Sequence, residues 1–171
     1  MRSERKGSIM KSITRVVLAV VVGVGLSMSA FAATSAFKDF NVSASVAANC
    51  TINATDMVFG AFDPLAAANV DSTSTVTITC TKGNGATIDM NLGNNAANAT
   101  LTTRAMSNGS AGYLDYQLYS DSSRLAVWTS FSSGAAPSKA ARPFTVYGRI
   151  PAAADAPSGT YGDVVRATVN F

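Results

Sequence analysis

The sequence contains no histidine among its 171 residues and a single glutamate, Glu4, near its start. Histidine is the side chain that most often transfers protons near neutral pH, so its absence argues against most hydrolytic and transfer enzymes. Serine is abundant, but a serine without an adjacent base is a weak nucleophile. The sequence also lacks a glycine-rich phosphate loop and the Asp/Asn pattern of a calcium loop. We therefore predict no catalytic residue, no cofactor and no metal site.

Aspartate supplies the remaining candidates for acid–base chemistry. Asp115 and Asp121 lie close together in the sequence, as do Asp63 and Asp71. Either pair could share a proton-transfer role. Aspartates in polar loops more commonly face solvent or cap turns, and that interpretation is favoured for all four residues.

Long hydrophobic runs are also scarce, and the one that is present belongs to an export signal. A basic leader precedes an unbroken run of apolar residues and glycine from Val16 to Leu26, and Ala30-Phe31-Ala32 offers the pattern that signal peptidase accepts. The run is shorter than the roughly 20 residues of a membrane span. We predict that residues 1–32 are a signal peptide, with Met10 as an alternative start, and that the chain is exported.

Charge is sparse once this leader is removed. Five of the 13 basic residues lie in the leader, which leaves eight, and nine of the ten acidic residues remain, all of them aspartate. The mature chain therefore has a net charge of about −1, and it lacks the basic face that nucleic-acid binding requires. We expect no nucleic-acid partner.

Cysteine occurs only twice, as Cys50 and Cys80. In an exported protein an even pair of cysteines favours a disulfide over a metal site. Two other uncommon side chains allow alternatives. Trp128 could stack against a sugar, although a place in the core is favoured, and Arg104 is interpreted as a solvated surface charge rather than a partner contact.

Apolar residues recur at every second position in the mature chain, which is the period of a β-strand. This alternation predicts strands around residues 76–80, 88–92, 114–119, 144–149 and 164–171. Turn-forming clusters separate them, among them 82–85, 93–95, 107–110 and 132–134. Several short strands with regular turns predict an all-β fold of two antiparallel sheets packed as a sandwich. No linker divides residues 49–171, so we expect one domain.

The same alternation occurs before Cys50, where Phe40, Val42, Ala44 and Val46 share one face of an extended segment. This segment could be an ordinary first strand that pairs within its own domain. Because it precedes the disulfide-linked body, it could instead pair with another molecule.

The mature chain resembles the spore coat protein U domain family, which includes pilin subunits of archaic chaperone–usher pili such as the Csu pilus. The segments that carry the resemblance are Cys50-Thr51-Ile52, Phe59-Gly60, Ile78-Thr79-Cys80, Arg104 with Met106, residues 114–119, residues 146–151, and the ending 159–171. The similarity runs from about Phe40 to the last residue.

The resemblance implies an incomplete immunoglobulin-like antiparallel β-sandwich that a donor strand from a neighbouring subunit completes. Residues 33–48 would be the donor-strand extension and 49–171 the pilin domain. A periplasmic chaperone would fill the open groove until, at an outer-membrane usher, an identical or related subunit replaces it. Candidates for the closing strand beside the groove are Val165, Ala167, Val169 and Phe171.

We therefore expect a structural subunit that is exported through the periplasm and polymerises on the cell surface as a pilus for adhesion and biofilm formation. Two alternatives remain. The chain could be a self-complete secreted coat protein of a spore or capsule, with Phe40 to Val46 paired in its own domain. More remotely, it could be a secreted carbohydrate-binding domain.

Overall fold

The computed structural model describes residues 34–171, so the predicted signal peptide, residues 1–32, lies outside the described residues. The chain divides into two units, Met1–Val42 and Ser43–Phe171. The described residues before Cys50 form neither helix nor strand. In this segment the side chains of Phe40, Val42 and Val46 are more than 80% exposed.

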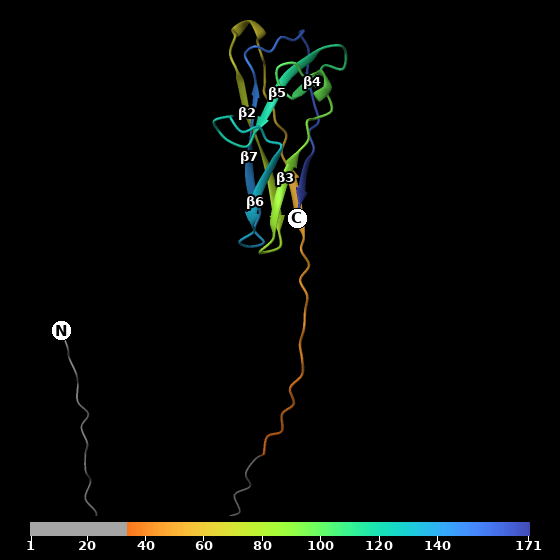
Figure 1. Ribbon diagram of the computed structural model, residues 1–171, viewed down its shortest axis with the longest axis vertical. Coiled ribbons are helices and arrows are strands. Elements are labelled where there is room, and N and C mark those ends of the chain that lie inside the picture. Colours follow the sequence, from red (N-terminus) through yellow and green to blue (C-terminus); the bar gives the residue numbers. More distant parts are fainter. Residues whose placement is uncertain (1–33) are drawn as a thin grey trace, which may run out of the picture. The chain divides into compact units, whose positions relative to one another are not determined.

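The larger sheet contains five antiparallel strands in the order β1-β2-β7-β5-β4. Their bounds are Cys50–Ala54 for β1, Val70–Cys80 for β2, Arg142–Ile150 for β7, Tyr113–Tyr119 for β5 and Arg104–Ser107 for β4. Valine, isoleucine, threonine and tyrosine dominate β2 and β7, and these side chains favour the pleated backbone. Figure 1 shows β2 and β7 side by side.

The smaller sheet contains three antiparallel strands in the order β6-β3-β8. The bounds are Ser130–Ala135 for β6, Gly85–Met90 for β3 and Ala167–Asn170 for β8. Two short 3-10 helices, Pro64–Ala66 and Ala96–Asn98, lie in loops. The predicted all-β sandwich of antiparallel sheets is confirmed.

The core lies between the sheets and is built from their inward-facing side chains. Ile78 of β2 and Ile88 of β3 are fully buried, and Trp128 is 1% exposed. The Trp128 indole N–H donates to the Ile88 carbonyl at 3.1 Å, and its ring packs beside Phe131. The expectation that Trp128 belongs to the core is therefore confirmed.

Cys50 and Cys80 form the predicted disulfide. They are direct partners in the β1–β2 ladder, with Cα atoms 4.1 Å apart. Beside them, Thr81 continues the pairing, because its N–H donates to the Asn49 carbonyl at 2.8 Å and its hydroxyl donates to the Ala47 carbonyl at 3.2 Å. The end of the N-terminal segment is thus bonded to the body up to Ala47.

The structure corrects two expectations about local structure. Residues 132–134 are strand rather than turn, because Gly134 adopts a φ of +65° beside a bulge in the β3–β6 pairing. The closing strand is β8, shorter than the expected 164–171. Alternation of side chains nevertheless continues on both sides of β8, since inward positions are half-buried from Tyr161 to Val169.

The expectation of a solvated Arg104 is wrong, since this side chain is 0% exposed. Its guanidinium donates to the Asn91 and Trp128 carbonyls and to Gln117 Oε1. A buried guanidinium is stable where its N–H groups all find acceptors. Arg104 therefore joins β4 of the larger sheet to segments next to β3 and β6.

Candidate functional site

The β8 strand has one side without a strand partner in the described part of the chain. β8 pairs with β3 on its other side, and just before β8 the Asn91 N–H donates to the Arg166 carbonyl at 3.1 Å. In an antiparallel ladder, alternate residues direct their N–H and C=O groups to opposite sides. The backbone N–H and C=O groups of Arg166, and of every second residue after it, therefore point to β3. Val165, Ala167 and Val169 direct their backbone groups to the open side and their side chains to the core.

The segment after β1 forms the other side of this opening. It remains attached to β2, because the Thr55 N–H donates to the Thr75 carbonyl at 3.0 Å and the Ser72 hydroxyl donates to the Val58 carbonyl at 2.6 Å. β1 is itself an edge strand of the larger sheet. The two sheets thus approach each other along edges that no strand of residues 34–171 joins.

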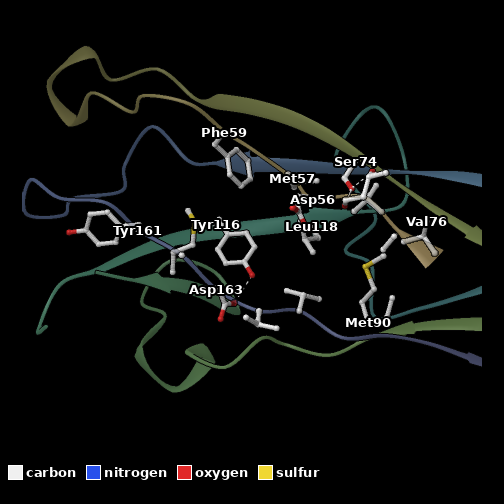
Figure 2. Close-up of a pocket in the computed structure, with 18 residues that line it drawn as sticks. Asp56, Met57, Phe59, Ser74, Val76, Met90, Tyr116, Leu118, Tyr161 and Asp163 are labelled. Carbon is white, nitrogen blue, oxygen red and sulfur yellow. Dashed lines mark hydrogen bonds between the residues drawn. The ribbon is translucent and has the colours of Figure 1, made fainter. Parts of the chain in front are cut away.

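A groove of about 400 Å³ lies between these two edges (Figure 2). Residues 54–57 and Phe59 line one side, and residues 161–165 with Ala167 line the other. Its floor consists of core-facing side chains of five strands, namely Ser74, Val76, Met90, Met106, Tyr116, Leu118 and Val146. A second hollow, of about 700 Å³, shares Met57, Phe59, Met106 and Tyr161 with the first and includes Leu114 and Ile150. The groove and this hollow reach the core of the sandwich from one side, and the floor side chains Val76, Tyr116, Leu118 and Val146 are at most 6% exposed.

Two hydrogen-bonded polar pairs line the groove, Thr55 with Ser74 and Tyr116 with Asp163. The Tyr116 hydroxyl donates to Asp163 Oδ2 at 2.6 Å (Figure 2). Asp163 Oδ1 accepts from the Asn94 N–H and the Asn95 side chain, both at 2.9 Å. Burial raises the pKa of Tyr116, and the bond to Asp163 raises it further, so the phenol stays protonated and donates. The pair of Tyr116 and Asp163 fastens the segment before β8 to the neighbouring loop.

Two glycines allow close packing around this groove. Gly93, next to Asn94, has a φ of +84°, and a Cβ there would collide with the Asp163 carboxylate. Gly148, in β7, lies under Met57 and Phe59, and a Cβ there would collide with both side chains. The edge of the Phe59 ring also approaches Tyr116, with centroids 6.1 Å apart. The side chains around the groove are therefore closely packed, and this packing fixes the shape of the groove.

The predicted site residues fall into two groups. Val165, Ala167 and Val169 are half-buried beside the opening, and the first two line the groove. Phe171, at 58% exposed, lies beyond β8. Phe40, Val42, Ala44 and Val46 are exposed and belong to no strand. Their role as a donor strand stays a prediction.

Sequence reasoning missed Tyr116 and Asp163 as groove residues. A signal for Asp163 existed, because it occupies an inward position of the alternation that runs from Tyr161 to Val169. Tyr116 lies in the predicted strand 114–119, but its partner lies 47 residues away in the sequence. No local pattern joins the two.

The four aspartates considered as acid–base pairs have other partners. Asp115 is buried and accepts from the Thr100 N–H and hydroxyl, so it is not solvated as expected. Asp121 accepts from two backbone N–H groups of its own loop, Asp63 caps a 3-10 helix, and Asp71 pairs with Arg149 at 2.7 Å. Within residues 34–171 the structure gathers no group of three side chains able to hold a metal.

Comparison with known proteins identifies the family. Residues 36–168, most of the chain and all of the groove, match the Spore Coat Protein U domain. The chain belongs to this family. It is also similar to "Protein U" of Myxococcus xanthus, with 34% identity over 179 aligned residues that cover 95% of this chain and 100% of the relative. Among residues 34–171, no helix reaches the length and hydrophobicity of a membrane span.

A solved structure shares the fold of this spore coat protein U domain. It is one chain of the CsuC–CsuE complex of Acinetobacter baumannii, described as a chaperone–tip adhesion subunit pre-assembly complex from archaic chaperone–usher Csu pili. The TM-score is 0.52 at 22% identity, over 74% of this chain. This chain spans 40% of the length of the chain it matches.

Proposed function

We propose that this protein is a structural subunit that polymerises by donor-strand complementation. Residues 33–48 of one copy would act as the donor extension, and residues 49–171 of the next copy would supply the acceptor groove. The observation that carries the proposal is the unpaired side of β8 beside an open apolar groove. An edge strand of this kind recruits another strand, because its free N–H and C=O groups need partners.

The exposed N-terminal segment has the pattern that such a groove requires. Phe40, Val42, Ala44 and Val46 fall on one face, while Asn41, Ser43 and Ser45 fall on the other. Moving each larger apolar side chain from water into the groove would contribute roughly 1.5–3 kcal/mol. Each new backbone hydrogen bond to the open side of β8 would add roughly 0.5–1.5 kcal/mol.

The assembly pathway proposed here is that of a chaperone–usher pilus. The chain would be exported through the periplasm, where a chaperone fills the groove, and an outer-membrane usher would exchange that chaperone for the next subunit. Similarity in fold to a chaperone–subunit complex supports this pathway. The filament would serve surface adhesion and biofilm formation, with this chain as a structural subunit.

A coat protein is the second candidate, and the comparisons supply its support. The name of the matching family refers to a spore coat protein, and the alignment to Protein U covers 95% of this chain. In a self-complete coat protein, residues 40–46 would close the sandwich within their own chain. The two candidates therefore differ in whether the groove is filled in trans or in cis.

Deletion of residues 33–48 separates the two candidates. The chain from Ala33 and the deletion variant from Asn49 would be refolded under oxidising conditions and compared by size-exclusion chromatography, electron microscopy and circular dichroism. Donor-strand complementation predicts that the longer chain forms linear polymers. The deletion variant should keep its β-sheet spectrum and disulfide but stay monomeric until a peptide of residues 36–47 is added.

Two results would contradict the proposal. Polymers of normal length from the deletion variant would show that the extension is dispensable. A monodisperse, stable monomer from the longer chain, together with loss of the β-sheet spectrum on deletion, would favour the self-complete coat protein.

A further inference from the structure

The groove side of the segment leading into β8 presents side chains of unequal size and polarity. Tyr161, Asp163, Val165 and Ala167 are its inward positions, in that order. Asp163 is the polar member, and its carboxylate is held in place by Tyr116. A strand that docks here must therefore present a small side chain to Asp163 and has the most room for a large side chain opposite Ala167.

We propose that residues 40–46 of a second copy dock antiparallel to β8 in one register, and that Asp163 with Tyr116 fixes this register. This inference rests on the proposed function and adds the register and the residues that determine specificity. The facing pairs are Val46 with Tyr161, Ala44 with Asp163, Val42 with Val165, and Phe40 with Ala167.

Size and polarity select this register over its neighbours. Directly opposed residues of an antiparallel pair point to the same face, so the register can shift only in steps of two. A shift in one direction places Val42 against Asp163, and a shift in the other places Val46 there. Either shift sets an apolar branched side chain on a carboxylate. In the proposed register, Ala44 faces Asp163 and the largest donor side chain faces the smallest acceptor side chain.

The charged residues of the extension agree with the same register. Lys38 shares a face with Phe40 and would lie opposite Val169, which is outside the residues that line the groove. A shift that moves Lys38 opposite Ala167 would bring its ammonium into the groove, at a high desolvation cost. On the outer face Asp39 would lie diagonally across from the exposed Arg166, within reach of a favourable charge contact.

The parallel orientation fits the groove less well. With Ala44 at Asp163, a parallel donor would carry Phe40 to Gly159 and leave Ala167 uncovered. The antiparallel orientation alone combines Ala44 at Asp163 with apolar coverage from Tyr161 to Ala167. It also matches the orientation of every other strand pair in the described structure.

Cysteine cross-linking on the outer face tests the register without altering the groove. Arg166 directs its backbone to β3, so its counterpart on the donor is a non-hydrogen-bonded partner with Cα atoms about 4.5 Å apart, which a disulfide can span. Four double variants of the mature chain would each carry Arg166→Cys together with Asp39→Cys, Asn41→Cys, Ser43→Cys or Ser45→Cys. Polymers would be oxidised briefly and separated on non-reducing gels.

The proposed register predicts that Asn41→Cys with Arg166→Cys forms a covalent ladder at least tenfold faster than the other three variants. Fastest cross-linking through position 39, 43 or 45 would mean a different register. Each of these outcomes would overturn the inference while leaving the proposed function intact. Normal polymers without any cross-link would place the contact elsewhere, and absence of polymers from the unmodified chain would contradict both proposals.

Discussion

Substitution of Val42 by aspartate in the donor segment should abolish docking in the groove. A peptide of residues 36–47 would be labelled at its end, and its binding to the deletion variant from Asn49 would be followed by fluorescence anisotropy at pH 7. The change would be Val42→Asp. The matched control would be Asn41→Asp, which introduces the same charge one position away on the face expected to meet solvent.

The magnitude follows from the apolar lining opposite Val42, where Val165 and the core-facing floor of the groove lie. Loss of the buried valine side chain removes roughly 1.5–3 kcal/mol. The carboxyl group must then enter the groove protonated, which at pH 7 costs roughly 4 kcal/mol for a group with an ordinary pKa near 3.9. The sum, about 6 kcal/mol, corresponds to a loss of affinity of roughly 10⁴-fold.

The control sets the limit for a non-specific charge effect. Asn41→Asp should change affinity by no more than about fivefold, because exposed charges near Arg166 contribute little. At pH 4 the cost of protonating the Val42→Asp carboxyl falls, so its binding should partly recover. Equal losses for the two peptides, or Val42→Asp binding within fivefold of the natural peptide, would refute the reasoning.

Three further changes test the packing. Ala44→Leu in the donor should weaken binding by roughly 5–150-fold, since overpacking costs about 1–3 kcal/mol, and unchanged anisotropy titrations would contradict it. Arg104→Met should lower the free energy of unfolding, measured by urea titration, by about 2–6 kcal/mol, because the carbonyls that Arg104 binds lose their donor. The control Arg166→Met, at an exposed position, should change the free energy of unfolding by no more than about 0.5 kcal/mol. Replacement of Cys50 and Cys80 by serine should cost about 3–4 kcal/mol by the same measurement, and no loss would contradict a stabilising disulfide.

Side-chain alternation predicted the fold class and the central strands well, because a strand with one buried face shows its period directly in the sequence. Ile78 and Ile88 are examples, since each lies at an alternating apolar position and is fully buried. The short strands β1 and β4 escaped this reasoning. With five and four residues, they offer too few positions for a period of two to be recognised.

The burial of Arg104 could not be predicted from its neighbours. Two of its acceptors are the carbonyl groups of Asn91 and Trp128, which lie 13 and 24 residues away in the sequence. The contact between Tyr116 and Asp163 has the same origin. Long-range partners of this kind depend on how the two sheets pack, and a local pattern carries no information about them.

The candidate site was only partly accessible from the sequence. The groove lies where two sheet edges have no strand between them. No residue type or pattern in the sequence indicates a missing strand. The donor pattern of Phe40 to Val46 and the inward positions Val165 and Ala167 could be found by alternation. That Val165 and Ala167 line a common groove needed the structure, and the role of residues 40–46 as its donor stays a proposal.

Amide hydrogen exchange at the open side of β8 tests the central claim most directly. Val165, Ala167 and Val169 direct their N–H groups away from β3, so these amides should exchange rapidly in the monomer. In polymers they should become protected together with the amides of Phe40, Val42 and Ala44, because these alternate residues of the donor direct their backbone groups to β8 in the proposed register. Equal exchange at these three amides in monomer and polymer would contradict the account. Protection already complete in an isolated monomer would contradict it as well.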